Sequence, residues 1–224
     1  MIILSIKLIV FDWNGTVFAD TVATYNSSAD TIEYFTKKRI SINRFRETFE
    51  VPIQKYYAHN GVEKSLFEKN QKVLMNMFHK NYEKREKTCR SRSGIKKVLE
   101  WLNKNKIEKI ILSNHTTRKI NSQLKRIKLN VYFDKVLAND SHYQTGNLDK
   151  KKRLMKFLKE NKFKKDEVLI IGDTVEEINI AENIGIKVVS ITSGFNSANR
   201  LKKATPDYLI NNMAELISIV EKEK

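Results

Sequence analysis

Polar residues follow three apolar runs of the sequence, and their types suit phosphate and metal chemistry. Carboxylate oxygens suit Mg²⁺, which usually takes one or two carboxylates together with waters and substrate phosphate. A serine hydroxyl and backbone amides suit phosphate oxygens. If the ends of the three runs meet, the sequence predicts a site for a phosphorylated ligand and a divalent cation. The polar groups are Asp12-Trp13-Asn14-Gly15-Thr16, Ser113-Asn114-His115, and Gly172-Asp173-Thr174 with Glu176 and Glu177.

The apolar runs themselves predict strands that alternate with helices. Helical spacing of apolar residues lies between the runs, and strands that alternate with helices favour a parallel sheet covered on both faces. The expected fold class is therefore α/β, with a Rossmann-like sheet, and ligands bind beyond the carboxyl ends of such strands. The predicted strands are Lys7–Phe11, Lys109–Leu112, Val168–Ile171 and Lys187–Ile191, and the helices are Gly94–Asn105, Thr117–Leu129, Lys150–Glu160 and Val175–Ile184.

One segment interrupts this alternation. Between about Asp20 and Arg90 the sequence contains no convincing buried strand, and it reads as several helices rich in Lys, Glu and aromatic residues. We therefore predict an α/β core over residues 1–18 and 91–224, with a helical subdomain inserted over residues 19–90.

Length, charge and cysteine content limit the class of protein. The 224 residues suffice for one core with a small insertion. The net charge of +16 favours anionic partners, among which nucleic acid is possible but not favoured, because no basic stretch is interleaved with aromatic residues. The single cysteine, Cys89, excludes an intramolecular disulfide and a multi-cysteine zinc site, so a cytoplasmic location is expected. No apolar run is long enough to span a membrane as a helix.

The motifs, taken in order, resemble those of the haloacid dehalogenase superfamily. A strand with DxxGT, a strand with SN, a lysine, and a strand with GDTxxE follow one another at fitting spacings. The helical insert resembles the C1-type cap of that family, and the tail from Pro206 resembles its phosphoglycolate-phosphatase-like members. The resemblance covers essentially the whole chain. It implies Mg²⁺-dependent hydrolysis of a small phosphorylated metabolite by a monomer or homodimer.

The resemblance also implies roles for particular residues. Asp12 would be the nucleophile that forms an aspartyl-phosphate. Lys151 would pair with the phosphate, because Leu154, Met155 and Leu158 then follow at +3, +4 and +7, although Lys150 remains an alternative. Mg²⁺ would be held by Asp12, the backbone carbonyl of Asn14 and Asp173, with Glu177 orienting its water, while phosphate would be bound by Ser113, Asn114, Gly15 and Thr16.

Asn14 departs from the pattern of the family's phosphatases, which usually carry an aspartate there as the general acid and base. An amide cannot shuttle a proton near neutral pH, and such help is typically worth ~10²–10⁴-fold. Four explanations stay open. The enzyme is slow, or prefers substrates with good leaving groups such as acyl or aryl phosphates; or Glu176, His115 or a cap residue serves as the acid instead. Alternatively, the chain is a binding protein for a phosphorylated ligand or nucleic acid, or Asn14, which precedes Gly15, is partly deamidated to a carboxylate.

A second branch of the superfamily provides an alternative. Phosphonoacetaldehyde hydrolases resemble this chain at Asp12-Trp13-Asn14-Gly15-Thr16, where they carry Asp-Trp-Ala-Gly-Thr without the acid aspartate. In that branch a cap lysine forms a Schiff base with the substrate. The corresponding residue here would be Lys55, although the residues that flank it match that branch poorly.

Overall fold

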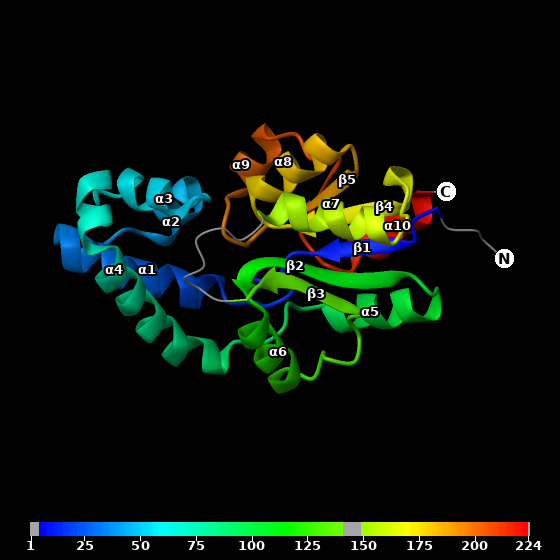
Figure 1. The fold of residues 1–224 in the computed structure, drawn as a ribbon, viewed down its shortest axis with the longest axis horizontal. Helices are drawn as coiled ribbons and strands as arrows, with labels where there is room; N and C mark the ends of the chain where they lie inside the picture. Colours follow the sequence, from blue (N-terminus) through cyan, green and yellow to red (C-terminus); the bar gives the residue numbers. More distant parts are fainter. Residues whose placement is uncertain (1–4, 141–148, 224) are drawn as a thin grey trace.

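A six-stranded parallel sheet forms the centre of the fold in the computed structural model, which describes residues 5–140 and 149–223 (Figure 1). All neighbouring strands pair in parallel, and the chain reverses its direction of travel across the sheet after β3, so that β4 lies beside β1. The predicted α/β class is confirmed. The strands, in the spatial order β3-β2-β1-β4-β5-β6, are β1 (Leu8–Phe11), β2 (Glu108–Thr116), β3 (Lys135–Asn139), β4 (Val168–Gly172), β5 (Lys187–Ile191) and β6 (Tyr208–Ile210).

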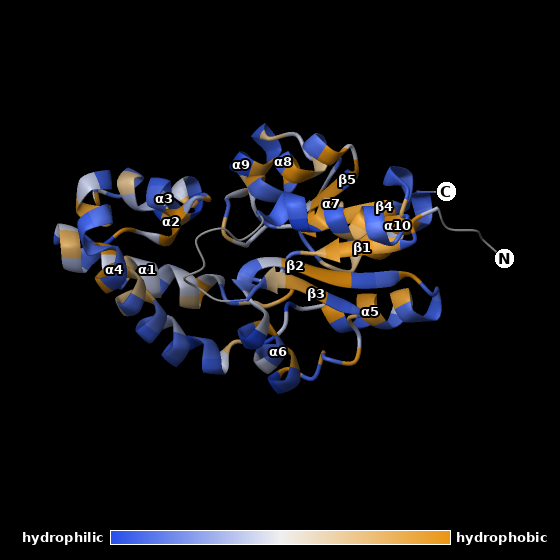
Figure 2. Ribbon diagram, in the orientation of Figure 1, coloured by the Kyte–Doolittle hydropathy of each residue, from blue (hydrophilic) through white to orange (hydrophobic). Residues whose placement is uncertain are grey.

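Helices cover both faces of the sheet because its strands are apolar on both sides. In β1, Ile9 and Phe11 join one apolar cluster, while Leu8 and Val10 join the other. Figure 2 shows the hydrophobic strands between helices whose outer surfaces are hydrophilic. The helices α5 (Ile95–Lys104), α6 (Thr117–Arg126) and α10 (Glu215–Lys222) pack on the first face, and α7 (Lys150–Glu160), α8 (Val175–Ile184) and α9 (Ala198–Lys203) pack on the second.

A separate group of helices lies between β1 and β2 in the chain and to one side of the sheet (Figure 1). These helices share an apolar cluster of their own that includes Phe45, Tyr56, Tyr57 and Phe67, and Phe195 from the core packs against it. We call them the cap helices, and the boundaries predicted for the insert at 19 and 90 stay a prediction. They are α1 (Thr21–Thr36), α2 (Ile42–Thr48), α3 (Ile53–His59) and α4 (Lys64–Arg85).

Two elements differ from their predicted form. The edge strand β3 was not predicted, since Val136, Leu137 and Ala138 make too short an apolar run and are only partly buried. Strand β2 continues to Thr116 instead of ending at Leu112, so Ser113 and Asn114 lie within the strand, where its pairing with β3 is irregular. Within the described ranges, no helix has the length and apolarity that a membrane crossing requires.

Candidate active site

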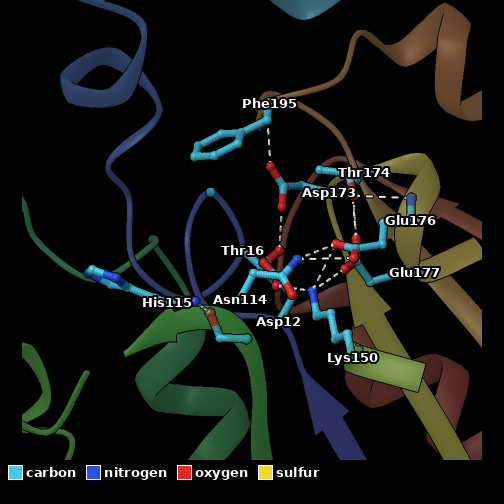
Figure 3. A network of polar contacts seen from close by, with 12 residues as sticks. Asp12, Thr16, Asn114, His115, Lys150, Asp173, Thr174, Glu176, Glu177 and Phe195 are labelled. Atoms are coloured by element: carbon cyan, nitrogen blue, oxygen red, sulfur yellow. Dashed lines mark hydrogen bonds and ion pairs between the residues drawn. The ribbon is translucent and has the colours of Figure 1, made fainter. Parts of the chain in front are cut away.

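The carboxyl ends of β1, β2 and β4 bring the predicted polar residues together. Asp12 directly follows β1 and Asp173 directly follows β4, while Lys150 opens α7. Figure 3 shows the Lys150 side chain directed at Asp12 and at the glutamates of α8. The Lys150 Nζ lies 2.5 Å from Asp12 Oδ1, also contacts Glu177 Oε1, and lies 3.6 Å from Glu176 Oε2. The site therefore contains a buried cation surrounded by three carboxylates.

The structure places Lys150, and not Lys151, against Asp12. Lys150 is only 3% exposed and contacts Asp12, whereas Lys151 is partly exposed and makes no described contact with Asp12. The two lysines differ in their position relative to the buried face of α7. Met155, which supported Lys151, is 50% exposed, and the buried face of α7 instead carries Leu154, Phe157 and Leu158 at +4, +7 and +8 from Lys150.

Asp173 is fully buried and held by two donors. Thr16 Oγ1 donates to Asp173 Oδ1 at 2.7 Å, and the Phe195 backbone N–H donates to Oδ2 at 2.6 Å (Figure 3). A Cβ atom at Gly15 or Gly194 would lie only 2.2 or 2.1 Å from Oδ2, so both glycines make room for this carboxylate. Gly15 also has a φ of +78°, in the left-handed region that favours glycine.

The structure separates the four residues predicted to bind phosphate into two groups. Gly15 and Thr16 position Asp173, and neither lines the cavity beside Asp12. Ser113 and Asn114 do line that cavity. The Ser113 hydroxyl accepts from the His115 backbone N–H at 3.1 Å, which leaves its proton available to a phosphate oxygen. The Asn114 amide donates to both oxygens of Glu176, at 3.0 and 2.9 Å, so it positions that carboxylate.

The electrostatics of the site favour a bound cation. Burial raises the pKa of Asp12 well above its usual range despite the attraction of Lys150, and the neighbouring Glu177 and Asp173 add to this effect. Burial and Glu177 together raise the pKa of Asp173 to about 7. Burial alone would lower the pKa of Lys150, but Asp12, Glu177 and Glu176 raise it well above its usual range. The single positive charge of Lys150 does not offset the negative charge of these buried carboxylates.

The donor set suits Mg²⁺ rather than a metal that needs a protein cage. In the part of the chain that the structure describes, no three His, Cys, Asp or Glu side chains converge as a metal cage. Mg²⁺ needs none, because it is usually bound by one or two carboxylates together with waters and phosphate. Asp12 and Asp173 supply hard oxygens, and their raised pKa values indicate a site where added positive charge is favourable.

Asn14 is held by two residues that the sequence analysis did not identify. Its Nδ2 donates to Asp20 Oδ2 at 2.7 Å and to the Tyr82 hydroxyl at 3.1 Å. Tyr82, from α4, donates to the same Asp20 oxygen at 2.5 Å, and the Gly15 N–H donates to Asp20 Oδ1 at 2.8 Å. Asp20 is fully buried, and burial raises its pKa. It precedes α1, where an aspartate commonly caps a helix, yet it makes no such cap.

Arg92 is a third residue that the sequence analysis missed. Its guanidinium donates to the backbone carbonyl of Thr16 at 2.9 Å, to that of Thr192 at 3.1 Å, and also to that of Gly15. Five planar donors allow one arginine to fix several carbonyls. Arg92 therefore holds the turn after β1 against the loop after β5. No motif marks it in the sequence.

Lys55, the residue of the Schiff-base alternative, lies away from the cavity beside Asp12. Lys55 is exposed on α3 and does not line the cavity beside Asp12, while its neighbours Ile53 and Tyr56 do. A lysine that forms a Schiff base with a substrate must reach the reacting carbon. The geometry therefore does not support a phosphonoacetaldehyde-hydrolase-like mechanism through Lys55.

Comparisons with known proteins agree with this fold. Residues 9–191 match the family model for haloacid dehalogenase-like hydrolases. Phosphoglycolate phosphatase 1 of Pseudomonas aeruginosa is 21% identical over 216 residues, which cover 94% of this chain and 78% of that protein. A Caldanaerobacter subterraneus protein named as a candidate pyrophosphatase, PpaX, is 22% identical over 221 residues, which cover 97% of this chain and 96% of that one.

A solved structure gives the same architecture. A haloacid dehalogenase-like family protein of Streptococcus pneumoniae superposes with a TM-score of 0.80 at 19% identity, and the match covers 96% of this chain and 98% of that one. The chain belongs to the haloacid dehalogenase-like hydrolases, as the sequence motifs predicted. The helical insert between β1 and β2 is consistent with a C1-type cap.

Proposed function

We propose that the chain is a Mg²⁺-dependent phosphatase that hydrolyses a small phosphomonoester through an aspartyl-phosphate on Asp12. The observation that carries the proposal is the buried contact between Asp12 and Lys150 at a cavity that Ser113 also lines. A nucleophile, a cation and a hydroxyl donor lie together there. The relatives named as a phosphoglycolate phosphatase and a candidate pyrophosphatase support hydrolysis of a phosphoryl group as the class of reaction.

The proposed hydrolysis has two chemical steps. In the first, an Asp12 oxygen bonds to phosphorus as the ester oxygen leaves with its electron pair. In the second, water attacks phosphorus and the bond to Asp12 breaks, which releases inorganic phosphate. Lys150 offsets the negative charge of the transferring group, and Ser113 donates to one of its oxygens. Cap helices that close over this cavity would exclude bulk water.

Mg²⁺ fits the same residues. The carboxylates of Asp12 and Asp173 and the backbone carbonyl of Asn14 would hold it, and Glu177 would orient its water. When bound, the ion supplies positive charge beside the phosphoryl group.

Trapping the covalent intermediate tests the proposal. We expect borohydride, added to the protein during turnover of a phosphate ester with Mg²⁺, to reduce the acyl phosphate at Asp12 to an alcohol. Mass spectrometry of peptides should then find homoserine at position 12. Protein treated without substrate is the control. If phosphate is released while position 12 is never modified, the covalent route is wrong.

Metal binding gives an independent prediction. Because Mg²⁺ would relieve repulsion among buried carboxylates, we expect it to raise the thermal midpoint of unfolding by about 5–10 °C when its concentration is ~100 times its dissociation constant. Differential scanning fluorimetry measures this shift. Asp173→Asn should remove most of it, whereas Asp166→Asn, an exposed position outside the site, should not. An equal shift in wild type and Asp173→Asn would place the ion elsewhere.

A further inference from the structure

We propose that this site is specialised for aryl phosphates, that is, phosphate esters of uncharged aromatic hydroxyls whose anions leave readily. The inference rests on the proposed function and specifies its substrate class. Two independent features carry it: the hydrogen bonds that occupy the donors of Asn14, and the character of the cavity wall on the cap side.

Asn14 cannot assist the leaving oxygen in this structure. An amide nitrogen carries two N–H donors. One is given to Asp20 Oδ2 and the other to the Tyr82 hydroxyl, at 2.7 and 3.1 Å. Asn14 therefore keeps only an acceptor, its oxygen. It can position a hydrolytic water, but it cannot protonate an alkoxide or donate a hydrogen bond to it.

The nearby tyrosine hydroxyls are also engaged. Tyr82 donates its proton to Asp20, and the Tyr56 hydroxyl pairs with Ser28 Oγ at 2.9 Å. Burial and the adjacent Asp20 raise the pKa of Tyr82 well above its usual range, which makes it a weaker acid. A leaving group that needs no proton suits these surroundings, and phenolates meet that requirement far better than alkoxides.

The cavity beside Asp12 has a volume of about 480 Å³, within the usual range for small-molecule sites. Its charged side chains, Asp12, Lys150, Glu176 and Glu177, all belong to the core. Among the described residues, the cap contributes no Lys or Arg to the wall. It contributes mainly aromatic and aliphatic side chains, including Tyr56, Tyr57, Met75, Phe78 and Tyr82.

This wall discriminates between leaving groups by charge. Within the described cap wall, a carboxylate on the leaving group, as in phosphoglycolate, would find no Lys or Arg to pair with, and burying an unpaired charge is costly. An aromatic ring would instead pack edge-to-face or offset against Phe78 and Tyr82, whose rings stack on each other with centroids 5.7 Å apart. The Asn14 hydrogen bonds and the cap wall therefore select the same chemistry.

The reaction balances without an internal acid. The bond from Asp12 oxygen to phosphorus forms as the bond from phosphorus to the aryl oxygen breaks, and the electron pair leaves with the phenolate. The phenolate takes its proton from solvent. Water then releases phosphate from Asp12.

The first test compares leaving groups. We expect wild-type kcat/KM, with Mg²⁺, to fall steeply as the pKa of the leaving group rises from 4-nitrophenyl phosphate through phenyl phosphate to an alkyl phosphate. The exchange variant Asn14→Asp/Asp20→Asn restores a carboxylate at position 14 and keeps a hydrogen bond between the two side chains. It should gain ~10²–10⁴-fold on the alkyl ester but only a few-fold on the nitrophenyl ester.

The second test concerns the cap wall. We expect wild type to prefer phenyl phosphate over 2-phosphoglycolate, and phenylphosphonate to inhibit better than phosphonoacetate. Met75→Arg places a cation on the wall and should shift the preference toward 2-phosphoglycolate by at least tenfold. Met77→Arg, on the same helix but not lining the cavity, is the matched control and should not shift it.

The outcomes separate the two proposals. If wild type hydrolyses the alkyl ester or 2-phosphoglycolate as fast as the aryl esters, the inference is overturned while the phosphatase proposal stands. A weak dependence on leaving-group pKa would reveal another acid, such as His79 or His115, which also line the cavity. If no ester in the series releases phosphate in either variant, the proposed function itself fails.

Discussion

Replacing Asp12 with asparagine is expected to lower kcat for phosphate release by at least ~10⁴-fold, because the amide is not a competent nucleophile toward phosphorus. The change preserves the shape of the side chain, and its oxygen can still accept a hydrogen bond from Lys150. Phosphate release from 4-nitrophenyl phosphate with Mg²⁺ measures the loss.

The same variant should remain folded. Burial already penalises the charge of Asp12, so removing that charge from a cluster with Asp173 and Glu177 should not lower the thermal midpoint measured without Mg²⁺. Asp166→Asn is the control for a neutral change at an exposed aspartate. Full activity in folded Asp12→Asn would rule out this nucleophile, and an unfolded variant would show that Asp12 is needed for stability.

The second large effect is expected for Lys150→Met, which should reduce both activity and stability. Removing the ammonium leaves Asp12 and Glu177 without their buried cation, and breaking a buried ion pair from one side typically costs about 3–5 kcal/mol of unfolding free energy. Losing a positive charge beside the transferring phosphoryl group should lower kcat by roughly 10³-fold. Urea unfolding and phosphate release measure the two effects.

Neighbouring lysines provide the controls for this prediction. Lys152→Met alters an exposed lysine of the same helix and should change neither quantity. Lys151→Met should reduce activity far less than Lys150→Met, because Lys151 does not contact Asp12. If Lys151→Met instead reduces activity more than Lys150→Met, Lys151 is the lysine that pairs with the phosphate. Added Mg²⁺ should recover part of the lost stability of Lys150→Met, since it offsets the same carboxylates.

The sequence was sufficient to predict most of the sheet and the strand ends at which the polar residues gather. Buried parallel strands are continuous apolar runs, so β1, β4 and β5 are visible without a structure. The edge strand β3 is half-exposed and pairs with β2 alone, so it lacks this signal. The choice between Lys150 and Lys151 depends on which face of α7 is buried. Because Met155 was counted as part of the buried face although it is exposed, the predicted face was displaced by one residue.

The surroundings of Asn14 could not be predicted for a different reason. Asp20 and Tyr82 are 62 residues apart, and their contact depends on where α4 of the cap meets the turn after β1. Local spacing contains no information about such a contact. The sequence shows an amide at position 14, but only the fold shows that the donors of this amide are already used.

The loop after β5 connects the cap to the site. The Phe195 N–H binds Asp173, while the Phe195 ring packs against Phe45 and Phe49 at centroid distances of 5.6 and 4.8 Å. Arg200 and Asn196 also donate to the Phe49 carbonyl.

Cap position and the orientation of Asp173 are consequently linked through one short segment. Linkage is reciprocal in free energy. If the proposed cation binds at Asp173, any factor by which a ligand that holds the cap in this position tightens cation binding is also the factor by which the cation tightens binding of that ligand. In such an arrangement substrate and metal bind cooperatively even where they do not touch each other.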